Sequence, residues 1–191
     1  MIPDREQALA IFSQYNDSEA LLRHALAVEG VMRHFARLYQ DPDVDRWGIV
    51  GLLHDIDYGK YPEEHCKKAI ELLKIHDIDE TIIRAVVSHG FGICSDVEPQ
   101  SDLEKVLYTI DELTGLINAA ALMRPTRSVL DMELKSLKKK FKTPSFAAGV
   151  DRAIISKGAE MIGMDLDVVL AEALTGMQQV APAIGLDGSA I

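Results

Sequence analysis

Residues 48–55 read GIVGLLHD, an apolar helical stretch that ends in a histidine and an aspartate. A carboxylate at the end of a buried helix is costly unless a cation or strong hydrogen-bond donors meet it. Asp55 therefore needs a partner, and the imidazole of the neighbouring His54 is a common metal ligand. This stretch predicts a charged centre inside a helical core.

Helical periodicity extends outward from this stretch over nearly the whole chain. Between Ser18 and Tyr39, apolar residues recur at spacings of three, four and seven, which predicts one amphipathic helix with Ser18 as its N-cap. The same reasoning predicts further helices over residues 4–14, 43–55, 62–75, 79–89, 101–123, 127–142, 146–162 and 165–179. We therefore expect an all-α fold.

The domain organisation follows from length and composition. A chain of 191 residues can form one well-cored domain and is short for two, and no change of composition marks a linker. We expect a single helical domain over residues 1–180, with a core at 18–123 and a C-terminal helical extension at 127–180. Residues 181–191, APAIGLDGSAI, show no periodicity and are expected to form a flexible tail.

The net charge of −10 repels polyanions, so we expect no nucleic-acid polymer as a partner. Residues 133–142, ELKSLKKKFK, form a local basic cluster within this acidic chain. The cluster is either a solvated helix face or a site for a phosphorylated ligand, and the sequence leaves both interpretations open.

The chain is expected to be cytoplasmic. No apolar run approaches the roughly 18 residues that a membrane helix requires, and the first residues do not resemble a signal peptide. Cys66 and Cys94 are too few for a disulfide framework, so we expect them to be small buried side chains in a reducing compartment. The oligomeric state is left open.

Six polar residues occupy positions where the helical pattern expects apolar ones. They come from five predicted helices and are His24, His54, Asp55, His65, His89 and Asp111. Each of them alone would usually be a hydrogen-bonded core residue, but one metal centre satisfies all of them together. Such donors suit divalent ions, among which Fe, Mn, Zn, Ni, Co and Mg are candidates. The lack of cysteine pairs argues against a structural zinc knuckle.

The order of these residues resembles the HD-domain superfamily, in its six-ligand subgroup with the order H…HD…H…H…D. The stretches that carry the resemblance lie within residues 18–120 and are RHALAVEGVMRHFA, GLLHDIDYGK, AVVSHG and YTIDELTGLI. The resemblance implies an HD-type helical bundle with extra C-terminal helices. It also implies a metal-dependent phosphohydrolase acting on a small phosphorylated substrate, such as a nucleotide, through a metal-activated water.

The resemblance also implies roles for individual residues. His24, His54, Asp55 and Asp111 match the ligands of a first ion, and Asp55 would bridge to a second ion held by His65 and His89. Asp55 and Lys60 are the catalytic candidates, although Lys60 lies two positions later than the lysine of the shorter HDIGK motif. Positive side chains are expected at the pocket mouth, and the candidates for substrate binding are Lys60, Arg124 and Lys140.

Two alternatives remain open at this point. Some HD-superfamily members with this ligand set are di-iron oxygenases, and a non-catalytic nucleotide-binding domain could keep the same scaffold. The two further histidines are expected not to be ligands. His34 lies ten residues after His24, which rotates it about 80° away from that face of the helix, and His76 falls in a turn.

Overall fold

The computed structural model describes residues 1–189, and this range is helical without any named strand. The elements in chain order are α1 (Arg5–Tyr15), α2 (Glu19–Leu38), α3 (Val44–Leu53), the 3-10 helix η1 (Pro62–Glu64), α4 (Lys67–Ile75), α5 (Glu80–Ser88), α6 (Asp102–Leu122), α7 (Leu134–Phe141), α8 (Arg152–Ile162) and α9 (Leu166–Gln179). The expectation of an all-α fold is confirmed.

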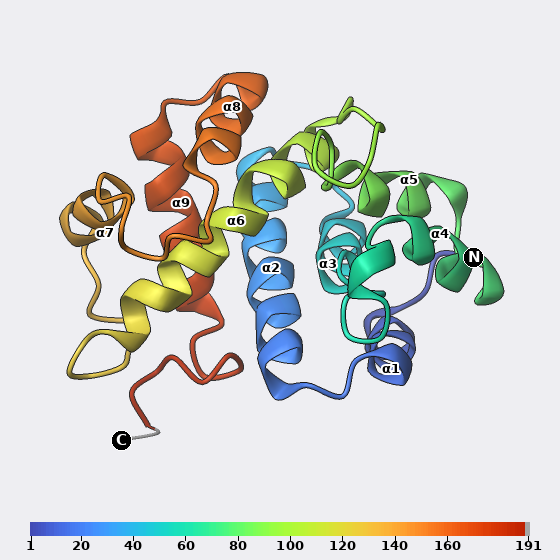
Figure 1. Cartoon of the computed structure of the whole chain (residues 1–191), viewed down its shortest axis with the longest axis horizontal. Coiled ribbons are helices and arrows are strands. Elements are labelled where there is room, and N and C mark those ends of the chain that lie inside the picture. The colour runs from blue at the N-terminus through green and yellow to red at the C-terminus, as the bar shows by residue number, and fades with distance from the viewer. Residues whose placement is uncertain (190–191) are drawn as a thin grey trace.

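Helices α2 and α6 form the centre of the molecule (Figure 1). Helix α2 packs against α3 and α9, and α6 packs against α2 and α8. Helices α1, α3, α4 and α5 lie on one side of this pair, and α7, α8 and α9 lie on the other. Both central helices are capped locally, since the Ser18 and Ser101 side chains accept hydrogen bonds from backbone N–H groups of the first turn.

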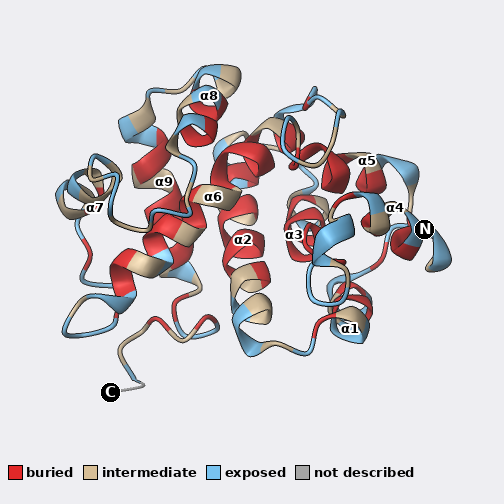
Figure 2. Ribbon diagram, in the orientation of Figure 1, coloured by how far each residue is buried: buried red, intermediate tan, exposed pale blue. Residues whose placement is uncertain are grey.

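Helix α3 is enclosed by its neighbours, and every residue from Trp47 to Leu53 is buried (Figure 2). A helix that is apolar on all sides is stable only inside a core. Its C-terminal end therefore carries His54 into the interior, where the side chain is fully buried.

The expected helix over residues 62–75 is interrupted. The chain forms η1, breaks at His65 and Cys66, and begins α4 at Lys67. Cys66 has a positive φ of 65°, a backbone conformation that residues other than glycine rarely adopt. The break is stabilised by buried Asp57, whose carboxylate accepts hydrogen bonds from the backbone N–H of Ala69 at 2.9 Å and from the His65 ring at 2.8 Å.

The C-terminal helices are also shorter than expected, because α7 begins at Leu134 and α8 at Arg152. The flexible tail expected from residue 181 onward is wrong for the residues that the structure describes. Ile184 and Leu186 are buried, and the Val129 N–H donates a 2.8 Å hydrogen bond to the Leu186 carbonyl. Residues 190–191 lie outside the described range.

No helix within residues 1–189 combines the length and the apolar character needed to cross a lipid bilayer.

Candidate metal centre

The structure brings together all six polar residues singled out in the sequence. His24 projects from the second turn of α2 and Asp111 from the middle of α6, while His54 and His89 cap the C-terminal ends of α3 and α5. Asp55 follows directly after His54. His65 stands in the break between η1 and α4, and not in a first helical turn as expected.

Four of these residues form a first cluster. The Nε2 atom of His24 lies 3.1 Å from Nε2 of His54 and 3.0 Å from Oδ1 of Asp111. Nε2 of His54 lies 3.4 Å from the same Asp111 oxygen and 3.3 Å from Oδ2 of Asp55. His24, His54 and Asp111 thus present three donor atoms close enough together to hold one ion.

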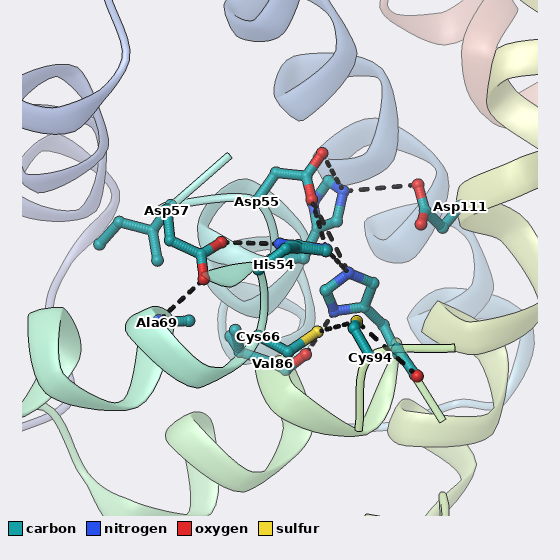
Figure 3. A network of polar contacts seen from close by, with 12 residues as sticks. His54, Asp55, Asp57, Cys66, Ala69, Val86, Cys94 and Asp111 are labelled. Atoms are coloured by element: carbon teal, nitrogen blue, oxygen red, sulfur yellow. Dashed lines mark hydrogen bonds and ion pairs between the residues drawn. The ribbon is translucent and has the colours of Figure 1, made fainter. Parts of the chain in front are cut away.

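A second cluster adjoins the first. Nε2 of His65 lies 3.1 Å from Nε2 of His89, and Oδ1 of Asp55 lies 3.5 Å from the first ring and 3.7 Å from the second. The two oxygens of the Asp55 carboxylate therefore face different clusters, as the close-up shows (Figure 3). A carboxylate in this position is able to bridge two ions.

The hydrogen bonds around His65 and His89 engage the Nδ1 atom of each ring and leave both Nε2 atoms available to bind a cation. The Nδ1–H of His89 donates to the Val86 carbonyl, and the Nδ1–H of His65 donates to the Asp57 carboxylate. In neutral rings, both Nε2 atoms then carry only lone pairs, yet they face each other at 3.1 Å. Two acceptors cannot satisfy one another, whereas a metal ion between them satisfies both.

The first cluster has the same character. The Nδ1–H of His54 donates to the Gly51 carbonyl at 2.7 Å, so the Nε2 lone pair of the neutral ring points toward His24 and the two carboxylates. Donation from the second nitrogen of a ligating ring to a fixed oxygen is the usual arrangement at metal sites, because it sets both tautomer and orientation. The residues present thus fit divalent ions in both clusters.

Asp57 was not identified from the sequence as part of the site. Its side chain is fully buried, and it joins the ring of His65 to the start of α4 (Figure 3). The sequence feature that could have identified it is its position, because Asp57 is a second acidic residue two positions after Asp55, just beyond the apolar helix. We interpret Asp57 as a positioning residue for His65.

The electrostatics of the clusters shift several pKa values. Burial opposes a charge on His54, but the carboxylates of Asp55 and Asp111 outweigh burial and raise its pKa well above the ordinary 6.5. Burial likewise opposes charge on the two carboxylates, and His54 overcomes it and lowers the pKa of each. His89 is fully enclosed, and burial followed by repulsion from His54 lowers its pKa.

A cavity of about 320 Å³ opens onto both clusters, and we name it the metal cavity. Besides the clusters it is lined by Tyr58, Gly90, Ile93, Cys94, Tyr108, Glu112, Gly115 and Ile154. The hydroxyls of the two tyrosines and the carboxyl group of Glu112 are polar groups that a bound molecule could contact.

The three basic residues expected at the mouth do not line this cavity. The Lys60 ammonium donates a 2.7 Å hydrogen bond to the Gln14 carbonyl, because the two residues inserted after the HDI stretch carry it toward α1. Arg124 pairs with Asp131 beyond the end of α6. Lys140 lies over the ring of Phe146. None of these side chains lines the metal cavity in this structure, and their contact with substrate stays a prediction.

The two cysteines lie beside the second cluster. Cys66 is buried, Cys94 is half-buried, and their sulfur atoms lie 2.8 Å apart. The Cys66 thiol stands close enough to His65 and His89 to count as a third possible donor there, which the sequence did not indicate. The hydrogen bond from Cys66, followed by the charge of His65, lowers the pKa of Cys94 to about 7.

The remaining histidines lie elsewhere. His34 links α2 to α9, since its Nε2–H donates to Glu172 at 2.6 Å. A 3.0 Å hydrogen bond joins Nε2 of His76 to the Tyr15 hydroxyl.

Comparison with known proteins supports the geometry. The family model described as HD domain matches residues 21–116, which include all six residues of the two clusters. A tRNA (cytidine(56)-2'-O)-methyltransferase from Picrophilus torridus is 32% identical in an alignment of length 140, and the match covers 64% of this chain. The chain spans only 40% of the length of that relative. No solved structure matches the chain. HD domains are all-α and generally belong to metal-dependent phosphohydrolases. The chain therefore belongs to the HD-domain family.

Proposed function

We propose that the chain is a metal-dependent phosphohydrolase that cleaves a phosphoester bond of a small molecule. The ligands would be His24, His54, Asp55 and Asp111 for one ion and Asp55, His65 and His89 for another. The observation that carries the proposal is the pair of Nε2 lone pairs that face each other at 3.1 Å between His65 and His89. A cation held by both nitrogens would satisfy the two lone pairs of the neutral rings at once.

The charge balance of the centre favours an anionic substrate. Two divalent ions would bring four positive charges, whereas the six side chains supply two carboxylates and four imidazoles that are neutral when they ligate. The loaded centre would therefore keep a net positive charge. Such ions lower the pKa of a water molecule and hold the oxygens of a phosphoryl group.

The side chains of this protein would orient the reactants. The buried Asp55 would hold the two clusters in register, and Asp57 would keep the His65 ring in its ligating tautomer. The hydroxyls of Tyr58 and Tyr108 would contact the bound molecule at the cavity wall. In the balanced reaction, water gives its hydroxyl to phosphorus, the bond from phosphorus to the ester oxygen breaks, and the alcohol leaves with the second proton.

The size of the metal cavity supports a small substrate. Its volume of about 320 Å³ falls at the lower end of the range for small-molecule sites. The methyltransferase activity in the name of the Picrophilus torridus relative forms no part of this proposal, because the match covers only 40% of that protein.

The test begins with protein stripped by chelation and reloaded separately with Mn²⁺, Co²⁺, Ni²⁺, Zn²⁺, Mg²⁺ or Fe²⁺. Each form is assayed with phosphomonoesters, phosphodiesters and nucleotides. We expect turnover with at least one ion and its loss in Asp55→Ala, while the control Asp96→Ala, which replaces an exposed aspartate on a neighbouring loop, keeps it. A centre loaded with two ions that hydrolyses none of these esters would contradict the proposal. Oxygen consumption by the iron form would instead indicate an HD-type oxygenase.

A further inference from the structure

A second cavity of about 260 Å³ adjoins the metal cavity, and we name it the side chamber. The two cavities share two lining residues, His24 and Gly115. The side chamber is apolar over much of its wall, through Ala20, Ala27, Leu122, Met177, Ile184 and Leu186. Arg23 and Asn118 are among the polar residues that line it.

The side chamber follows the helix faces that lead away from the metal centre. On α6, the lining residues Gly115, Asn118 and Leu122 follow Asp111 at intervals of four, three and four, so they lie on the same face as that ligand. On α2, Ala20 lies one turn before His24 and belongs to the same face. The side chamber therefore extends along the two central helices from the wall that it shares with the metal cavity.

Gly115 belongs to the wall that the two cavities share. A Cβ atom added at this position would meet only Val150 Cγ2, at 3.9 Å, so the space beside it is open. A glycine in the interior of a helix costs about 0.5–1 kcal/mol relative to alanine. Here the missing side chain leaves open space at the wall that the two cavities share.

One wall of the side chamber lies outside the residues that match the HD family model. Met177 belongs to α9, and Ile184 and Leu186 belong to the segment after it. That segment is held in place, since Leu186 bonds to Val129 and the turn at Gly185, with φ of 67°, packs against the Arg23 guanidinium. The chamber is thus completed by the C-terminal extension of this particular chain.

We propose that the side chamber binds the organic group of the substrate, and that this group is an apolar ring attached to the phosphoryl group. The proposal rests on the proposed function, because it takes the phosphoryl group to lie at the metal centre. Gly115 is then a specificity-determining residue: it admits the ring past His24, and a larger side chain there excludes it.

The test compares methyl phosphate, phenyl phosphate and 1-naphthyl phosphate with the metal-loaded protein. We expect kcat/KM to rise along this series in the wild type. Gly115→Leu should lower kcat/KM for the naphthyl ester by about 10- to 100-fold, the loss expected when an apolar ring can no longer be buried. Methyl phosphate should change less than about twofold, on the same reasoning, since it buries no ring. The matched control is Gly149→Leu, which places the same side chain at an exposed glycine that lines neither cavity and has open space around an added Cβ, and it should behave as the wild type.

A second measurement is independent of turnover. The fluorescence of 1-naphthol is titrated with metal-free protein. We expect binding by the wild type and by Gly149→Leu, and weaker binding by Gly115→Leu. Circular dichroism and ion content establish that the variant is folded. Should Gly115→Leu fail to fold, Ala20→Leu narrows the chamber from the opposite helix at an exposed position.

The outcomes separate the two proposals. Hydrolysis of all three esters with no response to Gly115→Leu overturns the role of the side chamber and leaves the proposed function standing. Absence of hydrolysis with an ion-loaded centre contradicts the proposed function. In that case, naphthol binding that Gly115→Leu weakens still supports an apolar ligand in the chamber, and equal or absent binding overturns it.

Discussion

Replacing Asp57 with asparagine should weaken the second ion and leave the first one in place. The carboxylate accepts from the His65 Nδ1–H at 2.8 Å and from the Ala69 N–H at 2.9 Å, and it has no exposed surface. Asparagine has nearly the same shape but only one acceptor oxygen. Its NH₂ group must therefore face either the Ala69 N–H or the His65 ring.

Either orientation has a measurable consequence. A buried donor left without an acceptor costs about 1–3 kcal/mol. If the NH₂ group instead donates to Nδ1 of His65, the ring proton moves to Nε2, and that nitrogen can no longer bind an ion. Loss of such a supporting contact typically lowers metal affinity by about 10- to 100-fold, which corresponds to about 1.4–2.8 kcal/mol.

The assay is competition with a chromophoric chelator, which resolves the affinities of the two ions. The control is Glu64→Gln, which removes an exposed charge one residue before His65. We expect one weakened ion in Asp57→Asn and two unchanged ions in the control. Wild-type affinity for both ions, or an equal loss of both, would refute the role given to Asp57.

Three further predictions concern stability and reactivity. The pKa of His54 is raised above 6.5 in the folded protein. The protonated His54 ring therefore contributes fully to stability below pH 6.5, and this contribution is lost as the pH rises through the pKa of the folded protein. Urea unfolding of metal-free protein should therefore show a free energy of unfolding that falls toward alkaline pH. A free energy of unfolding that rises over this range would contradict the prediction. The pKa of Cys94 is about 7, so iodoacetamide at pH 7 should alkylate Cys94 about fivefold faster than an ordinary cysteine, after allowance for the weaker nucleophilicity of its thiolate. Mass spectrometry measures the rate of alkylation. Cys66→Ala should abolish the difference in rate. Leu186→Ala should lower the free energy of unfolding by about 2–5 kcal/mol, because the side chain is buried, and an unchanged denaturation midpoint would show that the C-terminal segment is not packed.

The sequence predicted the helices and the convergence of the six polar residues because both depend on which helix face is buried. His24 and Asp111 share a stripe with apolar neighbours, and such a stripe must point inward whatever the details of packing. Periodicity therefore located the centre without any knowledge of the loops.

The expectations that failed depended on loops and on contacts distant in sequence. Lys60 follows a turn whose direction is set by the burial of Asp57, and no local pattern encodes that direction. Ile184 and Leu186 show no periodicity, and their burial depends on the surface that α2, α6 and α9 jointly offer. Whether a short apolar segment packs or frays is decided by such a partner surface.

The central claim is that the two clusters hold two divalent ions. Elemental analysis of protein purified without added metal, and again after reloading, counts the ions for each chain. We predict two ions in the wild type, one in His65→Ala, which damages the second cluster alone, and none held tightly in Asp55→Ala, which removes the shared carboxylate. A single ion in the reloaded wild type, or two ions in His65→Ala, would contradict the account.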